Sequence, residues 1–135
     1  MPNPTLKQDC RKSAAPLNFT LALRDGARMA SRKTAKQLRE LAQVAYERDL
    51  SRCIDELHRQ MADWKNGQMT VWDIEQSIHE FHNKIARSLY RSYAQTDSIL
   101  AVAIGIAQRV IVLADAPEEV REQLQQIIEG INRRN

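Results

Sequence analysis

The sequence predicts an all-α fold: a compact four-helix bundle of antiparallel helical hairpins with a basic N-terminal arm and helical extension. Three observations lead to this prediction. Hydrophobic residues recur every three or four positions along most of the chain, which is the spacing of one helix face. The 135 residues include only four glycines and four prolines, too few for the many tight turns of an all-β fold. Residues that favour helix starts and stops also border the periodic segments.

The length and composition favour one domain with its own core. A chain of this length usually forms a single domain, and 43% of its residues are hydrophobic, which is enough for a core. We expect a flexible basic arm over residues 1–30 and a single helical domain over residues 31–135. The bundle within that domain is expected to span roughly residues 47–132.

Charge divides the chain into two parts. Residues 1–39 carry nine basic and two acidic side chains, a net charge of +7, whereas residues 40–135 carry eleven basic and fifteen acidic ones, a net charge of −4. Such a basic segment can contact an anionic partner or the acidic body. Within the arm, residues 17–23 alternate apolar and polar side chains, as a strand does. Because a lone short strand is not stable in water, this segment is unstructured, helical or docked on another surface.

The first predicted helix spans about residues 34–65, with Ser31 or Thr34 as its N-cap. Its hydrophobic residues form two stripes that point in nearly opposite directions. The second half contributes Leu50, Ile54, Leu57, Met61 and Trp64, which we assign to the core, and the first half contributes Leu38, Leu41, Val44 and Ala45. Either the helix breaks near residues 47–49, or its first half faces residues 17–23 or a second subunit.

The second predicted helix, about residues 70–93, has the clearest start in the chain. Thr70 is an N-cap and Asp73 follows three residues later, a variant of the capping box. Met69 and Ile74 occupy the positions of a hydrophobic staple around that cap. The short link to the preceding helix predicts an antiparallel hairpin. The expected core residues are Ile74, Ile78, Phe81, Ile85 and Leu89.

Two further helices are expected at about residues 97–113 and 116–131. The first is apolar on all sides, which predicts a central, fully buried helix. A strand at residues 110–113 is the alternative, because that run is β-branched. Asp115 is the expected cap of the last helix and Pro117 fits its first turn. The expected core residues of the last helix are Val120, Leu124, Ile127, Ile128 and Ile131.

The sequence shows no signal for a membrane, for secretion or for a cofactor. The longest apolar run, residues 99–107, is too short to cross a bilayer, and no apolar secretory segment is visible at the start. Cys10 and Cys53 form no paired framework and are expected to be reduced thiols in the cytoplasm. The four glycines are scattered, which excludes the known phosphate-binding loops, and we expect no cofactor.

Histidines provide the one candidate for a metal centre. His79 and His82 are three residues apart and could share a helix face, opposite His58 on the preceding helix. Metal ligands in a bundle project into the core, and the helical spacing directs only His58 and His82 toward its edge. A metal-dependent enzyme centred on these two histidines is therefore the second alternative, and the favoured interpretation is that the histidines are solvated or hydrogen-bonded.

Basic residues of the arm and of the first helix provide a candidate nucleic-acid surface. Cations spread over such a segment can neutralise several phosphates. The candidate residues are Arg24, Arg28, Arg32, Lys33, Lys36 and Arg39. A helix-turn-helix reading of the last two helices is disfavoured, because the last helix carries four glutamates whose charge opposes DNA.

The leading hypothesis is a small non-enzymatic interaction or regulatory module, since the sequence offers surfaces and we identify no catalytic residues. The expected partner is a protein or another copy of the chain, with self-association through residues 34–46. The candidate partner-binding residues are Leu17, Phe19, Leu21, Leu38, Leu41 and Ala45. The first alternative is a nucleic-acid-associated protein that uses the basic arm, and no membrane contact is expected.

Overall fold

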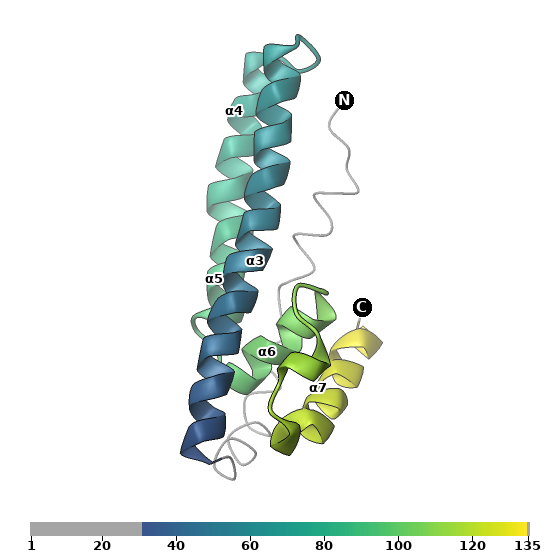
Figure 1. Ribbon diagram of the computed structural model, residues 1–135. Helices are drawn as coiled ribbons and strands as arrows, with labels where there is room; N and C mark the ends of the chain where they lie inside the picture. The colour runs from purple at the N-terminus through teal and green to yellow at the C-terminus, as the bar shows by residue number, and fades with distance from the viewer. Residues whose placement is uncertain (1–30, 135) are drawn as a thin grey trace.

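The computed structural model describes residues 31–134, and every regular element in that range is helical (Figure 1). The predicted all-α class is confirmed, and four helical segments pack against one another. The elements in chain order are α3 (Arg32–Lys65), α4 (Val71–Glu80), the π-helical η2 (Phe81–Ala86), α5 (Arg87–Tyr93), α6 (Ser98–Ala107), the 3₁₀ turns η3 (Leu113–Asp115) and η4 (Glu118–Val120), and α7 (Arg121–Arg134).

The expected arm lies outside the described residues, and so do the predictions made for it. These predictions include the alternating segment at residues 17–23. The candidate residues outside the described range are Leu17, Phe19, Leu21, Arg24 and Arg28.

A long helical hairpin forms the frame of the fold. Helix α3 forms one arm of the hairpin along its whole length. The segments α4, η2 and α5 form the other arm as one continuous rod beside α3 (Figure 1). Helix α6 crosses the hairpin near its open end, and α7 packs on α6. These two helices cover only the lower part of the hairpin in Figure 1, and its upper part projects beyond them. The bundle is therefore four helices deep over only part of the length of the hairpin.

Two of the helix starts that the sequence predicts are present. The backbone N–H of Thr34 donates to Ser31 Oγ at 3.1 Å, so Ser31 is the N-cap of α3. At the start of α4, the Asp73 N–H donates to Thr70 Oγ1 at 3.1 Å and the Thr70 N–H donates to Asp73 Oδ2 at 3.0 Å. Met69 and Ile74 are both buried beside this capping box. The hairpin turn is thus fixed by local interactions.

Helix α6 is the centre of the core, as its apolar sequence predicts. Residues 99–105 are all buried, and α6 packs against α3, α5 and α7. The crossing with α3 is close at Gly105, where an added Cβ would lie 2.6 Å from the Cβ of Ala45. Any larger residue than glycine would therefore push the two helices apart.

Helix α6 ends earlier than expected, at Ala107 rather than near residue 113. The Val110 N–H donates to the Gly105 carbonyl and the Arg109 N–H donates to the Ile106 carbonyl, both at 3.0 Å, which is a Schellman motif. Arg109 has φ 62° in the left-handed region, which glycine normally occupies at this position. Because the residue there is arginine, no glycine marks the end of the helix. The alternative strand at residues 110–113 is wrong, and a 3₁₀ turn follows instead.

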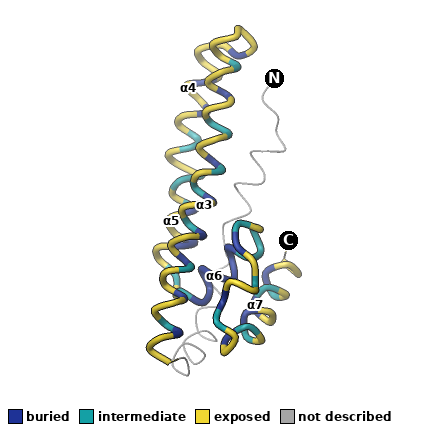
Figure 2. Tube along the Cα trace, viewed as in Figure 1, coloured by how far each residue is buried: buried dark blue, intermediate teal, exposed yellow. Residues whose placement is uncertain are grey.

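Helix α3 does not break near residues 47–49, and several residues of its two stripes have the reverse of their expected roles. The first-half residues Leu38 and Ala45 are buried in the core, where α6 packs on α3. In the second half, Ile54 and Met61 are exposed and not in the core as predicted. Most of the projecting part of the hairpin is exposed (Figure 2). The core of the chain therefore continues along α3 through a different set of residues from the apolar stripe.

The start of α7 also differs from the prediction. Asp115 accepts from the Val112 N–H at 3.2 Å and so belongs to the η3 turn, not to a cap of α7. Glu119 instead accepts hydrogen bonds from the hydroxyls of Thr34 and Ser31 at the start of α3. These bonds, above all the one from Thr34, hold the pKa of Glu119 below its usual value. The carboxylate fastens the α6–α7 unit to the N-terminus of α3.

Candidate interaction surface

A buried polar network lies where α3 and α5 meet. The Asp49 carboxylate is 0% exposed and accepts from the Tyr93 hydroxyl at 2.7 Å. Its other oxygen pairs with Arg52 Nη2, also at 2.7 Å. The Tyr46 ring stacks on Tyr93 with centroids 5.5 Å apart. Burial, and next the Asp49 charge, raise the pKa of Tyr93 far above its usual value, so the phenol stays protonated and donates.

Two arginines extend this network to the end of α6. Arg52 Nη1 donates to the Gln108 carbonyl at 3.1 Å, and Arg48 Nη1 donates to the Val110 carbonyl at 2.9 Å. The last carbonyls of a helix lack partners within the helix and carry partial negative charge, so two cations suit this position. The network therefore joins α5, α3 and the end of α6.

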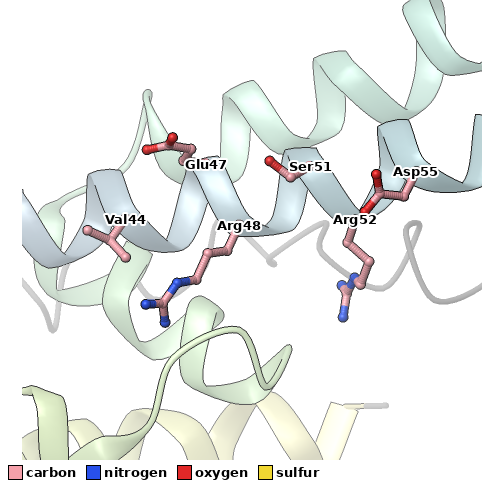
Figure 3. A pocket seen from close by; sticks show the side chains of 6 residues that line it. All are labelled: Val44, Glu47, Arg48, Ser51, Arg52 and Asp55. Atoms are coloured by element: carbon pink, nitrogen blue, oxygen red, sulfur yellow. The ribbon is translucent and has the colours of Figure 1, made fainter. Parts of the chain in front are cut away.

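The outer face of α3 beside these arginines forms an open hollow (Figure 3). It is lined by Val44, Glu47, Arg48, Ser51, Arg52 and Asp55, all from one helix. The two arginines point toward the α6–α7 unit, while Glu47 and Ser51 point away from it. The two basic and two acidic groups balance, and both arginines already hold backbone carbonyls. We therefore assign a structural role to this face, not an anion or catalytic site.

The interior of the projecting part of the hairpin is partly polar. We call residues 54–80 the far half, and residues 32–53 with 81–93 the near half. In the far half, Gln60 and Ser77 are buried between the helices, together with Ile74 and Met69. Because amides and hydroxyls line part of that interface, folding removes less apolar area from water there than it would in a leucine-lined interface.

Large hydrophobic side chains instead lie on the outside of the far half. We define the apolar flank as five residues, each between 36% and 52% exposed: Ile54, Met61, Trp64, Val71 and Ile78. Single exposed hydrophobic residues are common on proteins, but a contiguous group marks an interaction surface. Whether these five are contiguous depends on which side of each helix they occupy.

Helical geometry places the flank residues of both helices on one side of the hairpin. Ile54 follows the buried Cys53 by one residue, and Ile78 follows the buried Ser77 by one residue. One residue is a turn of about 100° around a helix. In two antiparallel right-handed helices, the residue that follows an interface residue lies on the same side of the pair in both helices. Ile54 and Ile78 therefore share a face. Met61, which follows the buried Gln60, joins them by the same geometry.

Charge is distributed unevenly along the hairpin. The near half holds nine basic and three acidic side chains, a net charge of +6. The far half holds two basic and six acidic side chains, a net charge of −4. The hairpin therefore has a basic open end and an acidic tip, with the apolar flank on the acidic half.

Most of the candidate partner-binding residues on α3 already pack against other parts of the chain. Leu38 and Ala45 are buried in the core, and Leu41 is half-buried against it. The candidate cations of the described range are all exposed, and Lys36 Nζ lies 3.8 Å from Glu40 Oε1. These cations are Arg32, Lys33, Lys36 and Arg39.

The histidines do not converge. His58 lies on an exposed face of α3, and His82 is exposed within the π-helical segment η2. His79 is 3.5 Å from Glu75 on the surface of α4. Within residues 31–134, no three side chains of the metal-binding types lie close enough to hold an ion. In that same range, no helix has both the length and the hydrophobicity needed to span a bilayer.

Sequence reasoning missed the Asp49–Tyr93–Arg52 network and misassigned the apolar flank. One signal was available, because Asp49, Cys53 and Gln60 continue the spacing of Leu38, Ala42 and Ala45 along one helix face. The polar character of the second set concealed this continuity. Comparisons of the chain with protein-family models, with curated proteins and with solved structures found no match.

Proposed function

We propose that the protein is a non-enzymatic helical interaction module that binds a protein partner through the apolar flank. The observation that supports this proposal is the inverted distribution of side chains in the far half. Gln60 and Ser77 take buried positions in this half, while Ile54, Met61 and Ile78 lie outside. Covering this exposed apolar surface contributes roughly 25 cal/mol per Å² removed from water. A helix or helical pair laid along the flank would supply the missing cover.

This proposal moves the partner surface from residues 34–46 to the far half. Leu38 and Ala45 already pack inside the chain, and exposing them would cost the interactions of the core. The flank needs no such rearrangement, because its side chains are accessible in the folded chain.

The test is site-specific crosslinking in the native host. A photoreactive phenylalanine analogue replaces Met61 on the flank, and in a matched control it replaces Val112, which is 58% exposed but lies between α6 and α7. We expect a discrete crosslinked protein species from position 61 and none from position 112. An added Ile54→Asp change should remove that species. Equal patterns from both positions would contradict the proposal.

Nucleic-acid association is a second candidate, favoured by the exposed cations of the near half. Lys33 and Arg39 on α3, and Arg87 and Arg91 on α5, contribute to its net charge of +6. Exposed cations of this density can neutralise phosphates, and such binding weakens steeply with salt. The test is titration of generic duplex and single-stranded probes at several salt concentrations. Loss of binding in Lys33→Glu with Arg39→Glu would support it, and absence of binding at low salt would exclude it.

A further inference from the structure

We infer that the partner on the apolar flank is a second copy of this chain, packed head to tail, so that the far half of each hairpin lies along the near half of the other. This inference rests on the proposed function and adds the identity and orientation of the partner. It uses three features of the described residues: the charge distribution, the position of the flank and the clear space beside it.

The charge distribution fixes the orientation. With +6 on the near half and −4 on the far half, head-to-tail packing brings opposite charges together along both halves. Packing in the same direction would instead place +6 beside +6 and −4 beside −4. Complementary charge adds little affinity at a solvated surface, but it selects partners and register, and juxtaposed like charges are penalised. The chain is therefore complementary to itself in one orientation only.

The flank itself suits a two-fold interface. In a symmetric dimer each contact occurs twice, so the flank of each copy packs on the near half of the other. The flank runs along both helices, from Ile54 to Trp64 on α3 and from Val71 to Ile78 on α4. Two hairpins joined along such a surface make a four-helix bundle, a common packing of antiparallel helical pairs. Each copy would then cover the exposed flank of the other.

The α6–α7 unit leaves this side of the hairpin open. Arg52 precedes the buried Cys53 by one residue and reaches the end of α6. Ile54 follows Cys53 by one residue and belongs to the flank. At about 100° per residue, these two neighbours point to opposite sides of the hairpin. A second copy on the flank therefore meets no obstruction from α6 or α7.

The first test is the oligomeric state of the full chain, measured by sedimentation across a range of concentrations. We expect a dimer, and we expect Ile54→Asp to raise its dissociation constant at least about 30-fold, as for a central interface residue. Trp72→Asp is the matched control, because Trp72 is 74% exposed but follows Val71 by one residue and so leaves the flank. Circular dichroism checks that both variants remain helical.

The second test is orientation, and it does not depend on a destabilising change. A spin label at Gln68→Cys, in a Cys10→Ser background, marks the exposed hairpin turn, while Cys53 is buried. At 1.5 Å rise per residue, head-to-tail packing separates the two labels by more than about 30 Å. Any shorter separation would bring the tips too close together for this packing and overturn the inference.

The outcomes separate this inference from the proposed function. A monomer at every concentration overturns the second copy, and so does a dimer that Ile54→Asp and Trp72→Asp affect equally. In the first case, a crosslink from position 61 to a different protein would still support the proposed function. A crosslinked species of twice the mass of the chain, together with a long label separation, supports both.

Discussion

The near and far halves of the hairpin are built from the same two helical rods but bury different side chains. In the near half, α6 covers Leu38, Ala42 and Ala45 and completes an apolar core. In the far half, no described element covers the hairpin (Figure 2). Gln60 and Ser77 take buried positions there, and Ile54, Met61 and Ile78 are exposed. This difference is what we expect if the far half packs against a further partner.

The largest expected effect comes from removing core volume in the near half. Leu89 is fully buried, so Leu89→Ala should lower the free energy of unfolding by about 2–5 kcal/mol. Ile54→Ala, on the same hairpin but in the flank, should cost less than about 1 kcal/mol in the monomer. Denaturant unfolding at low protein concentration measures both. Equal losses would mean that the two halves are packed alike, which would contradict the comparison.

The buried network that joins α3, α5 and α6 should give the next largest effect. Asp49→Ala leaves Arg52 and the Tyr93 hydroxyl without their shared partner and should cost about 2–4 kcal/mol. This loss of stability is smaller than for a fully buried ion pair, because the Arg52 side chain is 39% exposed. Tyr93→Phe should cost about 1–3 kcal/mol, since it removes one donor to a buried carboxylate. Thermal unfolding of the three proteins orders these losses.

The same network predicts how stability depends on pH. Because the pKa of Tyr93 is raised in the folded chain, its contribution is complete below the usual tyrosine pKa of about 10. As pH rises above that value, the unfolded chain loses the phenolic proton while the folded chain keeps it, so stability should fall. Denaturant unfolding between pH 8 and about pH 11 should show this loss in the wild type and a smaller loss in Tyr93→Phe. Identical profiles would contradict the assignment.

A smaller effect is expected where α3 and α6 cross. Gly105→Ala improves intrinsic helix propensity, but its Cβ would lie 2.6 Å from the Ala45 Cβ. Over-packing of this kind typically costs about 1–3 kcal/mol. Chemical denaturation should therefore show a destabilised variant, and the double variant Ala45→Gly with Gly105→Ala should recover part of the loss. A more stable Gly105→Ala single variant would show that the crossing has room.

The smallest expected effect is a gain in stability. Arg109→Gly relieves the left-handed conformation at the end of α6 and should add about 0.5–1 kcal/mol, once the greater freedom of glycine in the unfolded chain is counted. A shift in the midpoint of thermal unfolding would measure it. Arg109→Ala serves as the control and should bring no comparable gain, because alanine keeps the Cβ that disfavours this conformation.

The sequence predicted what local interactions determine. The Ser31 and Thr70 caps, the turn before α4 and the central position of α6 follow from residue types and spacing, and the structure confirms them. The apolar flank could not be predicted. A stripe of hydrophobic residues on a helix indicates that this surface will be covered, but it does not indicate which element covers it. Ile54 and Met61 share the spacing of core residues, so they were assigned to the core. The end of α6 was missed because Arg109 occupies a position where glycine is the usual signal.

Hydrogen exchange measured along the hairpin tests the central contrast most directly. We expect backbone amides of residues 54–80 to exchange quickly in dilute protein and to become protected as protein concentration rises and the second copy covers the flank. Amides of residues 99–105, inside the core of the chain, should show strong protection at every concentration. Equal protection of the two segments in dilute protein, unchanged at high concentration, would contradict the account.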